Sequence, residues 1–497
     1  MVRSSLMRRA SQAAFALGTV LGMALATAPA ALGQSAPLRL TPAVTEALMS
    51  AQAAAAYTCP STCVAPGCQC GTTDPVATLA PPQTPQFLVV TVDDCVNANT
   101  EALLAPVFRD GSLKNPDGRA IPLTYFLSLV GCATGTNSNA ALVKSRYDKG
   151  DEMAVHTRAH STGTGTSAAT WASEIASVKT FLSDAGVNVA RDVKGFRAPY
   201  LATNSSMFTA VKNAGFLYDS SVMESPFYSP VSSGIGSFLW PYTFDHGKAQ
   251  LCSSWASDNN CPSGTLPGLW ELPLYEYVST TDVNSSPEFY GVLDLGGPQA
   301  YSGYPSRIEG SDLRNIFQLH FNERYTGNRA PMMLGFHAPG FDSGLRQREI
   351  RENIATMLAQ PNVWAVTATG LVEWMQNPVP ASQMTAWYQG YCQRHPCSAA
   401  TPVASEDDVR AQVVTALTVF PNPARGTFSV DATLATAGAA TVEVVDLLGR
   451  QVRALMASGT DRVRASFTTA GLAPGTYLVR VTDAQGHASA PERLIVR

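Results

Sequence analysis

The feature that most limits the folds open to this chain is an alternation of two segment types across residues 85–400. Short apolar runs rich in β-branched and aromatic residues, which are typical of strands, are followed by longer segments whose apolar positions recur at helical spacing. Several of the helix-like segments end at Gly or just before Pro, as helices usually do. This alternation predicts an α/β fold, and its length favours an α/β barrel.

The predicted strands are FLVVTV (87–92), IPLTYFLSLV (121–130), EMAVHT (152–157), VKGFRAP (193–199), LYDSSV (217–222), GLWELPL (268–274), MMLGFHA (332–338) and VWAVTAT (363–369). The predicted helices include 167–186, 204–215, 345–360 and 370–376. In α/β barrels, polar residues at the carboxyl ends of the strands line the functional site. Polar residues that directly follow these strands are therefore the candidates for chemistry.

The first predicted strand ends in two adjacent carboxylates, Asp93 and Asp94. Neighbouring residues on an extended strand point in opposite directions, so the two need not share a role. His156 and His160 are four residues apart, and on a helical turn both imidazoles would project from one face. Two neutral imidazoles and one carboxylate make a three-ligand site for Zn²⁺ that leaves a position for water.

Other polar residues at strand ends complete a hydrolytic set. One aspartate of the pair can bind metal while the other acts as a base toward water. His337 could then protonate a leaving amine or alcohol, and Arg197 and Asp219 also follow predicted strands. Taken singly, each of these residues has an ordinary structural explanation, such as a solvated turn or a core histidine. Their shared placement at strand ends is what favours a metal-dependent hydrolase.

Five short motifs occur in a fixed order: TVDD, HTRAHS, RAPY, YDSS and LGFHA. In this order they resemble the motifs of the polysaccharide deacetylases of carbohydrate esterase family four, which contain the NodB-homology domain. The resemblance implies an irregular (β/α) barrel of the NodB-homology type over residues 85–400. It also implies a divalent metal, with zinc favoured and cobalt as an alternative.

The resemblance also implies a role for each motif residue. Metal would be held by Asp94, His156 and His160. Asp93 would be the general base, held by a charge-assisted hydrogen bond from Arg197. The backbone N–H of Tyr200 would help to stabilise the oxyanion. His337 would be the general acid, with Asp219 as its orienting partner.

Further segments resemble the chitin deacetylases of arthropods, among them NRAPMMLGFHA and GLWELPL. This implies removal of N-acetyl groups from chitin-like polymers. Three features depart from the family pattern: Val92 replaces the usual Phe, Cys95 follows the aspartate pair where Gly or Ala is common, and HAPGF lacks the aromatic that often follows the acid His in the arthropod enzymes. Peptidoglycan, xylan or another acetylated glycan stays open as the substrate, and so does a glycan-binding pseudoenzyme.

The N-terminus and the cysteines indicate export. Residues 1–33 have a basic start, an apolar stretch and small residues near Gly33, which predicts a secretory signal peptide. An Ala-rich and Cys-rich segment and linker follow over 34–84. Ten cysteines in an exported chain predict disulfides, with a zinc site in CPSTCVAPGCQC as the alternative. Plausible pairs are Cys252 with Cys261 and Cys95 with Cys132.

Residues 411–497 change character, with short alternating strands separated by Gly, Pro and Asn turns, which predicts a small β-sandwich. VFPNP, VVDLLGR, PGTYLVRV and ERLIVR resemble the sorting domain of the type IX secretion system. The resemblance implies that the type IX machinery is a partner and that the protein is secreted or held on a bacterial surface. The alternative is an accessory sandwich that binds carbohydrate.

The remaining composition excludes two classes of partner. A net charge of -4 over 497 residues provides no footprint for nucleic acid. Beyond the N-terminal stretch, which is short for a membrane span, there is no other long apolar run. We therefore expect no nucleic acid partner and no transmembrane segment, while the family resemblance implies an acetylated polysaccharide as the substrate.

Overall fold

The computed structural model divides the chain into two compact units, Met1–Ala399 and Ala400–Arg497, which are described separately. The residues that the structure describes are 57–76, 79–132, 134–161, 165–224, 237–250, 264–278, 289–290, 311–399, 414–434, 438–445, 451–459, 461–483, 489 and 491–497. The predicted signal peptide and the cysteines Cys252 and Cys261 lie outside these residues.

The first unit is built on one curled sheet with the strand order β12-β1-β2-β3-β4-β5-β8-β7, and β13 also pairs with β1. All of these pairings are parallel except that of β7 with β8. The strands are β1 (Gln86–Asp94), β2 (Thr124–Leu127), β3 (Glu152–Val155), β4 (Gly195–Phe196), β5 (Tyr218–Asp219), β7 (Tyr242–Thr243), β8 (Trp270–Glu271), β12 (Met332–His337) and β13 (Val363–Ala365). Two short pairs, β6 (Met223–Glu224) with β9 (Leu274–Tyr275) and β10 (Tyr277–Val278) with β11 (Phe289–Tyr290), lie outside this sheet.

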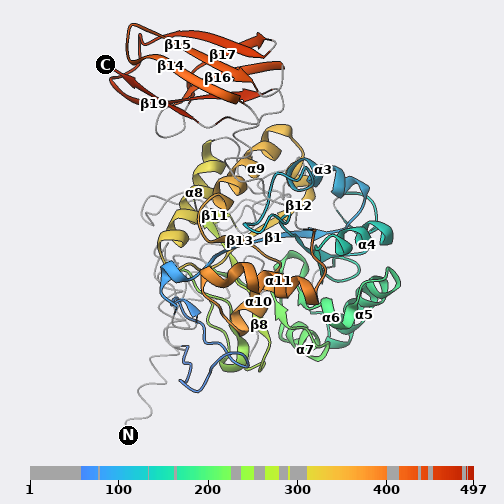
Figure 1. Ribbon diagram of the computed structural model, residues 1–497. Helices are drawn as coiled ribbons and strands as arrows, with labels where there is room; N and C mark the ends of the chain where they lie inside the picture. The colour runs from blue at the N-terminus through green and yellow to red at the C-terminus, as the bar shows by residue number, and fades with distance from the viewer. Residues whose placement is uncertain are drawn as a thin grey trace, which may run out of the picture. The chain divides into compact units, whose positions relative to one another are not determined.

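Helices surround the sheet (Figure 1). They are α3 (Ala98–Phe108), α4 (Ala140–Asp148), α5 (Ala168–Asp184), α6 (Val189–Asp192), α7 (Ser205–Asn213), α8 (Ser311–Thr326), α9 (Gly344–Leu358), α10 (Ala368–Gln376) and α11 (Met384–Arg394). The predicted irregular α/β barrel is thus confirmed. All eight predicted strand segments and the four predicted helices are present, whereas α3, α4, α6, α8 and α11 were not among the predicted helices.

β1 forms the centre of the unit because both of its faces are covered, and all nine of its residues are buried. Leu88, Val90 and Val92 belong to the apolar core that includes residues of α3, α5 and α7. Phe87 and Val89 belong to a second core on the other face, which includes residues of α10 and α11. This double burial explains why the strand reads as an unbroken apolar run in the sequence.

The described cysteines of the first unit are paired in disulfides: Cys59–Cys70, Cys63–Cys68, Cys95–Cys132 and Cys392–Cys397. The predicted preference for disulfides over zinc, and the predicted Cys95–Cys132 pair, are confirmed. The Cys-rich segment lies along the edge strand β7, where Gln69 and Thr243 exchange hydrogen bonds. This segment therefore covers a sheet edge that would otherwise be open to pairing.

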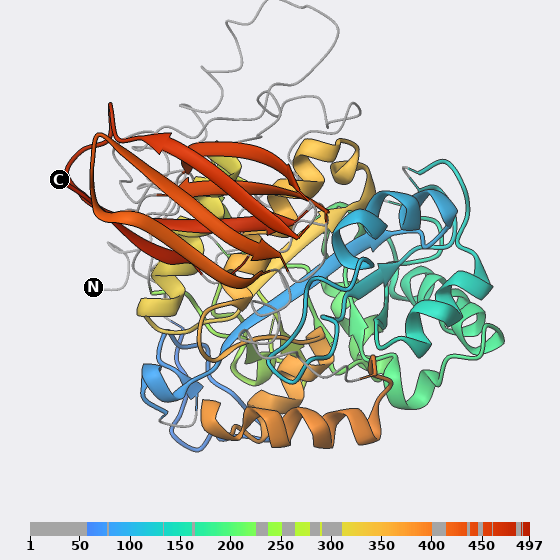
Figure 2. The ribbon, with the colours of Figure 1, turned by 45° about the horizontal axis from the view of Figure 1, so that its top comes forward.

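The second unit is a mainly antiparallel β-structure with the strand order β17-β16-β19-β20-β14-β15-β18 (Figure 2). Its strands are β14 (Val414–Arg425), β15 (Thr427–Leu434), β16 (Gly438–Val445), β17 (Gln451–Gly459), β18 (Arg462–Thr468), β19 (Gly475–Asp483) and β20 (Glu492–Val496). Buried and exposed residues alternate along β18, as expected for strands with one face on a core. The predicted β-sandwich character is confirmed.

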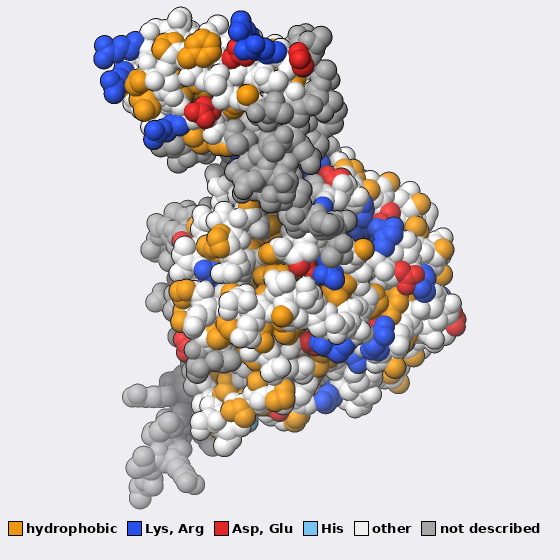
Figure 3. All heavy atoms as spheres, viewed as in Figure 1, with side chains coloured by type: hydrophobic (Ala, Val, Ile, Leu, Met, Phe, Trp, Pro, Cys, Tyr) orange, Lys and Arg blue, Asp and Glu red, His pale blue; other side chains and the backbone are white. Residues whose placement is uncertain are grey.

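Two further observations concern the surface charge and the helices. On the face shown in Figure 3, Lys and Arg side chains are interspersed with Asp and Glu and form no continuous basic area among the described residues. Within the described residues, no helix combines the length and the apolar character that crossing a membrane requires.

Candidate metal centre and active site

Neighbouring parallel strands bring most of the sequence-predicted residues to one edge of the sheet. Asp93 and Asp94 end β1, and His337 ends β12 in register with Asp93. His156 and Arg197 directly follow β3 and β4, which lie two and three strands from β1. Residues separated by more than 240 positions therefore meet because parallel strands carry their carboxyl ends to the same side.

The three predicted metal ligands converge at this edge. One ligand atom each from Asp94, His156 and His160 lies within 4.8 Å of the other two. Asp94 Oδ1 is 3.2 Å from His160 Nε2. Asp94 Oδ1 and His156 Nε2 are both buried, and neither has a hydrogen-bond partner among the described residues. Buried acceptors without partners are costly, and a bound cation would remove that cost, so these residues fit a divalent metal.

The histidines are held in the neutral form that metals bind. His156 Nδ1 lies 2.8 Å from the carbonyl oxygen of Arg197, and donation of the Nδ1 proton there leaves the lone pair of Nε2 facing the site. Burial lowers the pKa of His156 to about 4, even though nearby carboxylates oppose the shift. Burial also lowers the pKa of His160 against the opposing charge of Asp94. Both imidazoles are thus available as ligands at neutral pH.

The local backbone of the histidine motif differs from the sequence-based expectation. Residues 156–161 form an irregular loop after β3 and not a helical turn. Thr157 and His160 have positive φ angles of 64° and 48°, and these turn the chain so that the two rings approach to 5.1 Å between centroids. The predicted helical turn was wrong, but the side chains of His156 and His160 still face the same point.

Asp93 is locked to a buried guanidinium. Arg197 Nη1 donates to Asp93 Oδ1 at 2.7 Å and to Thr91 Oγ1 at 2.9 Å. The same guanidinium also donates to the carbonyl oxygen and hydroxyl of Ser220, and it stacks over the Phe126 ring at 3.9 Å. Burial would raise the pKa of Asp93, but Arg197, His156 and His337 outweigh burial and lower it. Asp93 is therefore a fixed, ionised carboxylate.

Tyr200 lies at the rim of the same edge. The residue is 44% exposed, and its ring centroid is 4.6 Å from that of His160. Its φ of 56° is followed by 55° at Leu201, so two left-handed residues turn the chain beside the metal ligands. The predicted contribution of the Tyr200 N–H to oxyanion binding stays a prediction.

Asp219 and Glu271 form a pair of buried carboxyl groups that the sequence did not reveal as a pair. They are register partners on β5 and β8 and hydrogen bond to each other, and Asp219 also accepts from Ser221. Burial raises the pKa of Asp219 to about 6, and burial and Asp219 raise that of Glu271 well above its usual value. The available signal was a lone acid inside the apolar segment GLWELPL. The predicted role of Asp219 as partner of His337 stays a prediction.

Backbone strain is concentrated around the site. Among the described residues, seven that are not glycine have positive φ, and five of them are at or beside the predicted site: Asp94, Thr157, His160, Tyr200 and Leu201. Such conformations cost roughly 1–3 kcal/mol each and persist only where the surroundings impose them. Their accumulation here indicates a functional centre.

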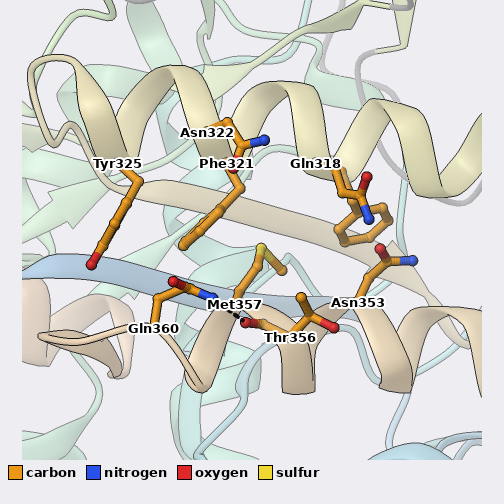
Figure 4. A pocket seen from close by; sticks show the side chains of 9 residues that line it. Gln318, Phe321, Asn322, Tyr325, Asn353, Thr356, Met357 and Gln360 are labelled. Carbon is orange, nitrogen blue, oxygen red and sulfur yellow. Dashed lines mark hydrogen bonds between the residues drawn. The ribbon is translucent and has the colours of Figure 1, made fainter. Parts of the chain in front are cut away.

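A groove lies elsewhere on the first unit. Figure 4 shows a groove between α8 and α9, where Phe321, Tyr325 and Met357 are flanked by Gln and Asn side chains. None of the sequence-predicted site residues lines this groove. It contains no ionisable acid or base other than the Tyr325 hydroxyl, which donates to Pro361. We therefore place the candidate active site at the strand ends and not in the groove.

Two chitin deacetylases of Bombyx mori are similar to part of this chain. Chitin deacetylase 1 of Bombyx mori is 29% identical over 328 residues, covering 64% of this chain and 56% of that protein. Chitin deacetylase 8 of Bombyx mori is 27% identical over 330 residues, covering 64% of this chain and 77% of that protein. The chain thus spans little more than half the length of the first relative.

Solved structures with similar coordinates include a family 4 carbohydrate esterase from Streptomyces lividans in complex with acetate, with 15% identity, a TM-score of 0.30 and coverage of 56% of this chain and 91% of that chain. A family 4 acetyl xylan esterase from Clostridium thermocellum in complex with a cobalt ion has 13% identity and a TM-score of 0.32. The match covers 60% of this chain and 95% of that chain. TM-scores this low add no further argument.

Family models match two separate regions. The polysaccharide deacetylase model matches residues 80–218, which include all of the predicted site residues except His337 and Asp219. The model of the secretion system C-terminal sorting domain matches residues 418–497, which cover nearly the whole β-structure of the second unit. Residues 80–218 are thus similar to the polysaccharide deacetylases, and residues 418–497 are similar to secretion system C-terminal sorting domains.

Proposed function

We propose that this protein is a secreted, metal-dependent deacetylase that removes N-acetyl groups from chitin-like polysaccharides. The observation that carries the proposal is the convergence of Asp94, His156 and His160, together with the buried Nε2 of His156, which has no hydrogen-bond partner among the described residues. These three side chains would hold the metal, with zinc favoured and cobalt as the alternative. A divalent cation bound there would supply Lewis-acid activation of water and of the substrate carbonyl.

Asp93 is the proposed general base. The buried guanidinium of Arg197 fixes the carboxylate and keeps it ionised, so Asp93 is ready to accept a proton from water as the oxygen attacks the acetyl carbon. Attack converts the planar amide to a tetrahedral centre with a negatively charged oxygen. The backbone N–H of Tyr200 is the proposed donor to this oxygen.

His337 is the proposed general acid. Its register pairing with Asp93 places it on the neighbouring strand, beside the base. Donation of a proton from His337 to the amide nitrogen allows the C–N bond to break, which releases acetate and leaves a free amine on the sugar. We keep Asp219 as the proposed orienting partner of His337, and loss of activity at unchanged metal content in Asp219→Asn would support this.

The sorting domain supports delivery to the outside of the cell. We propose that the type IX secretion machinery recognises residues 411–497 and that the deacetylase acts as a secreted or surface-held enzyme. A polymeric glycan outside the cell is the substrate class that such delivery makes accessible.

Acetate release is the test of the proposal. The purified protein would be stripped of metal with a chelator, reloaded with Zn²⁺ or Co²⁺, and assayed on chitin oligomers, acetylated xylan and peptidoglycan. We expect release from chitin oligomers that disappears on chelation and returns with metal. Faster release from xylan or peptidoglycan would replace the substrate and keep the chemistry, whereas metal-independent release, or none at all, would overturn the proposal.

A further inference from the structure

Residues 128–132, which follow β2, contact the backbone on both sides of the metal centre; we call them the bracing segment. Ser128 N donates to the carbonyl oxygen of Asp94 at 3.0 Å. The hydroxyl of the same serine donates to the carbonyl oxygen of His156 at 2.8 Å. One residue therefore ties the main chain of a β1 ligand to that of a ligand after β3.

The next residues of the bracing segment hold the loop between the two histidines. Leu129 N and Val130 N both donate to the carbonyl oxygen of Arg158, at 3.0 and 3.1 Å. Gly131, with φ of 82°, packs so closely that a Cβ there would lie 3.0 Å from the carbonyl oxygen of Ala159. It would also lie 3.9 Å from Cβ of His160. A side chain at position 131 would therefore meet the histidine loop, including the third ligand.

A disulfide closes the arrangement. Cys132, the last residue of the bracing segment, is bonded to Cys95, which directly follows the ligand Asp94 in the chain. Cys95 is buried, with 1% of its surface exposed. The disulfide therefore anchors the segment covalently to the β1 end of the site, while hydrogen bonds anchor it to the histidine loop.

Strained ligands need such support. Asp94 has φ of 82° and His160 has φ of 48°, so two of the three proposed ligands adopt a conformation that most residues avoid. Without a surrounding structure that imposes these angles, both residues would relax toward ordinary backbone geometry. Their side chains would then move away from the common point.

We propose that the bracing segment and its Cys95–Cys132 disulfide position Asp94, His156 and His160, and thereby set the affinity of the site for a divalent metal. This inference rests on the proposed function, because it requires a metal to bind. These residues act through the ligands and are positioning residues. Substitutions that disturb the surroundings of a metal ligand typically lower metal affinity about 10–100-fold.

The first experiment removes the disulfide. Cys95→Ala with Cys132→Ala in one protein would be compared with wild type and with the control Cys392→Ala and Cys397→Ala, which removes a disulfide at the end of α11. Apoprotein would be titrated with Co²⁺, followed by its visible absorption, and with Zn²⁺ against a chromophoric chelator. We expect the dissociation constant to rise about tenfold or more in the first variant and to change less than about twofold in the control.

A second pair of variants leaves every disulfide in place, and it decides the matter if the first variant does not fold. Gly131→Ala would push a methyl group against the histidine loop. The matched control is Gly135→Ala, which also has a positive φ, of 77°, but has no atom within 4 Å of the added Cβ. Both alanines strain the backbone, so only the contact with the histidine loop differs between them.

We expect Gly131→Ala to weaken binding of Co²⁺ and Zn²⁺ about tenfold and Gly135→Ala to leave it nearly unchanged. Equal affinities in Gly131→Ala and wild type would overturn the positioning role while leaving the proposed function intact. If wild-type apoprotein binds neither metal, the proposed function itself fails, and this inference fails with it.

Discussion

The two units of this protein differ in how far the arginines of their ion pairs are exposed to solvent. In the first unit, Arg197 and Asp93 form an ion pair whose side chains are 0% and 6% exposed. In the second unit, Arg462 and Arg464 both pair with Asp431 from exposed positions on β18. The side chains of Arg462 and Arg464 are exposed to solvent, whereas the side chain of Arg197 is fully buried.

The difference follows from how each sheet is covered. β1 is parallel to its neighbours and buried on both faces, so charges at its end are enclosed by protein. β18 alternates between buried and exposed residues, and its charges point to solvent. Enclosing an ion pair costs desolvation energy that hydrophobic packing would avoid, so such a pair is expected mainly where chemistry needs it. The comparison teaches that the buried charge pair of the first unit lies at the candidate active site, whereas the arginines of the second unit pair at the surface.

The largest effects are expected at the two aspartates. Asp93→Asn keeps the shape of the side chain but removes the base, so turnover should fall by about two to four orders of magnitude with metal retained. Asp94→Ala removes a proposed ligand, so the metal itself should be lost or bound far more weakly. His156→Ala and His160→Ala should resemble Asp94→Ala, and His337→Ala should resemble Asp93→Asn. Elemental analysis paired with acetate release distinguishes the two classes, and loss of metal in Asp93→Asn alone would reverse the assignment.

The next largest effect is expected from breaking the buried ion pair between Arg197 and Asp93. Arg197→Met removes the partner of Asp93 and leaves a buried carboxylate uncompensated, which we expect to cost about 3–5 kcal/mol in the free energy of unfolding. Arg464→Ala is the matched change in the second unit, where one of two exposed partners of Asp431 is lost. Its unfolding midpoint should stay within experimental error. Comparable losses in urea unfolding of the two variants would contradict the contrast between the units.

A third prediction concerns an ion pair of intermediate exposure. His395 Nδ1 lies 2.9 Å from Asp192 and its Nε2 lies 2.7 Å from Glu373. Burial would lower the pKa of His395, but these two carboxylates outweigh it and raise the pKa to about 9. The unfolded value is about 6.5, so this stabilisation is complete below pH 6.5 and disappears as the pH rises through about 9.

The wild-type free energy of unfolding should therefore decline between pH 6.5 and 9 more steeply than that of His395→Gln. Urea unfolding at several pH values measures both slopes. Parallel slopes in the two proteins would show that the imidazolium between the carboxylates contributes nothing.

The smallest effect on catalysis is expected from removal of the second unit. Deletion of residues 411–497 should leave acetate release by the purified protein nearly unchanged, because the proposed catalytic residues all lie in the first unit. Delivery to the cell surface or medium should be lost. A truncated protein that is folded by circular dichroism but inactive would show that the second unit takes part in catalysis.

Sequence alone predicted eight strand segments and four helices of the first unit, and it supplied the candidate site residues. The β1 apolar run, the Gly and Pro residues that end several helices and the order of the five motifs depend on local residue types, so they can be recognised without a structure. The pairing of Cys95 with Cys132 was also within reach, because both follow predicted strands and export favours disulfides.

Tertiary structure decided what depends on distant segments and on backbone angles. The left-handed residues Thr157 and His160 replaced the expected helical turn, because the bracing segment imposes a loop that no local propensity favours. The carboxyl pair of Asp219 with Glu271 arises from the register of two strands that are 52 positions apart in the chain. Local sequence carries the identity of each side chain, whereas its neighbours across the sheet are set by packing of the whole barrel, and those neighbours determine which charges are buried together.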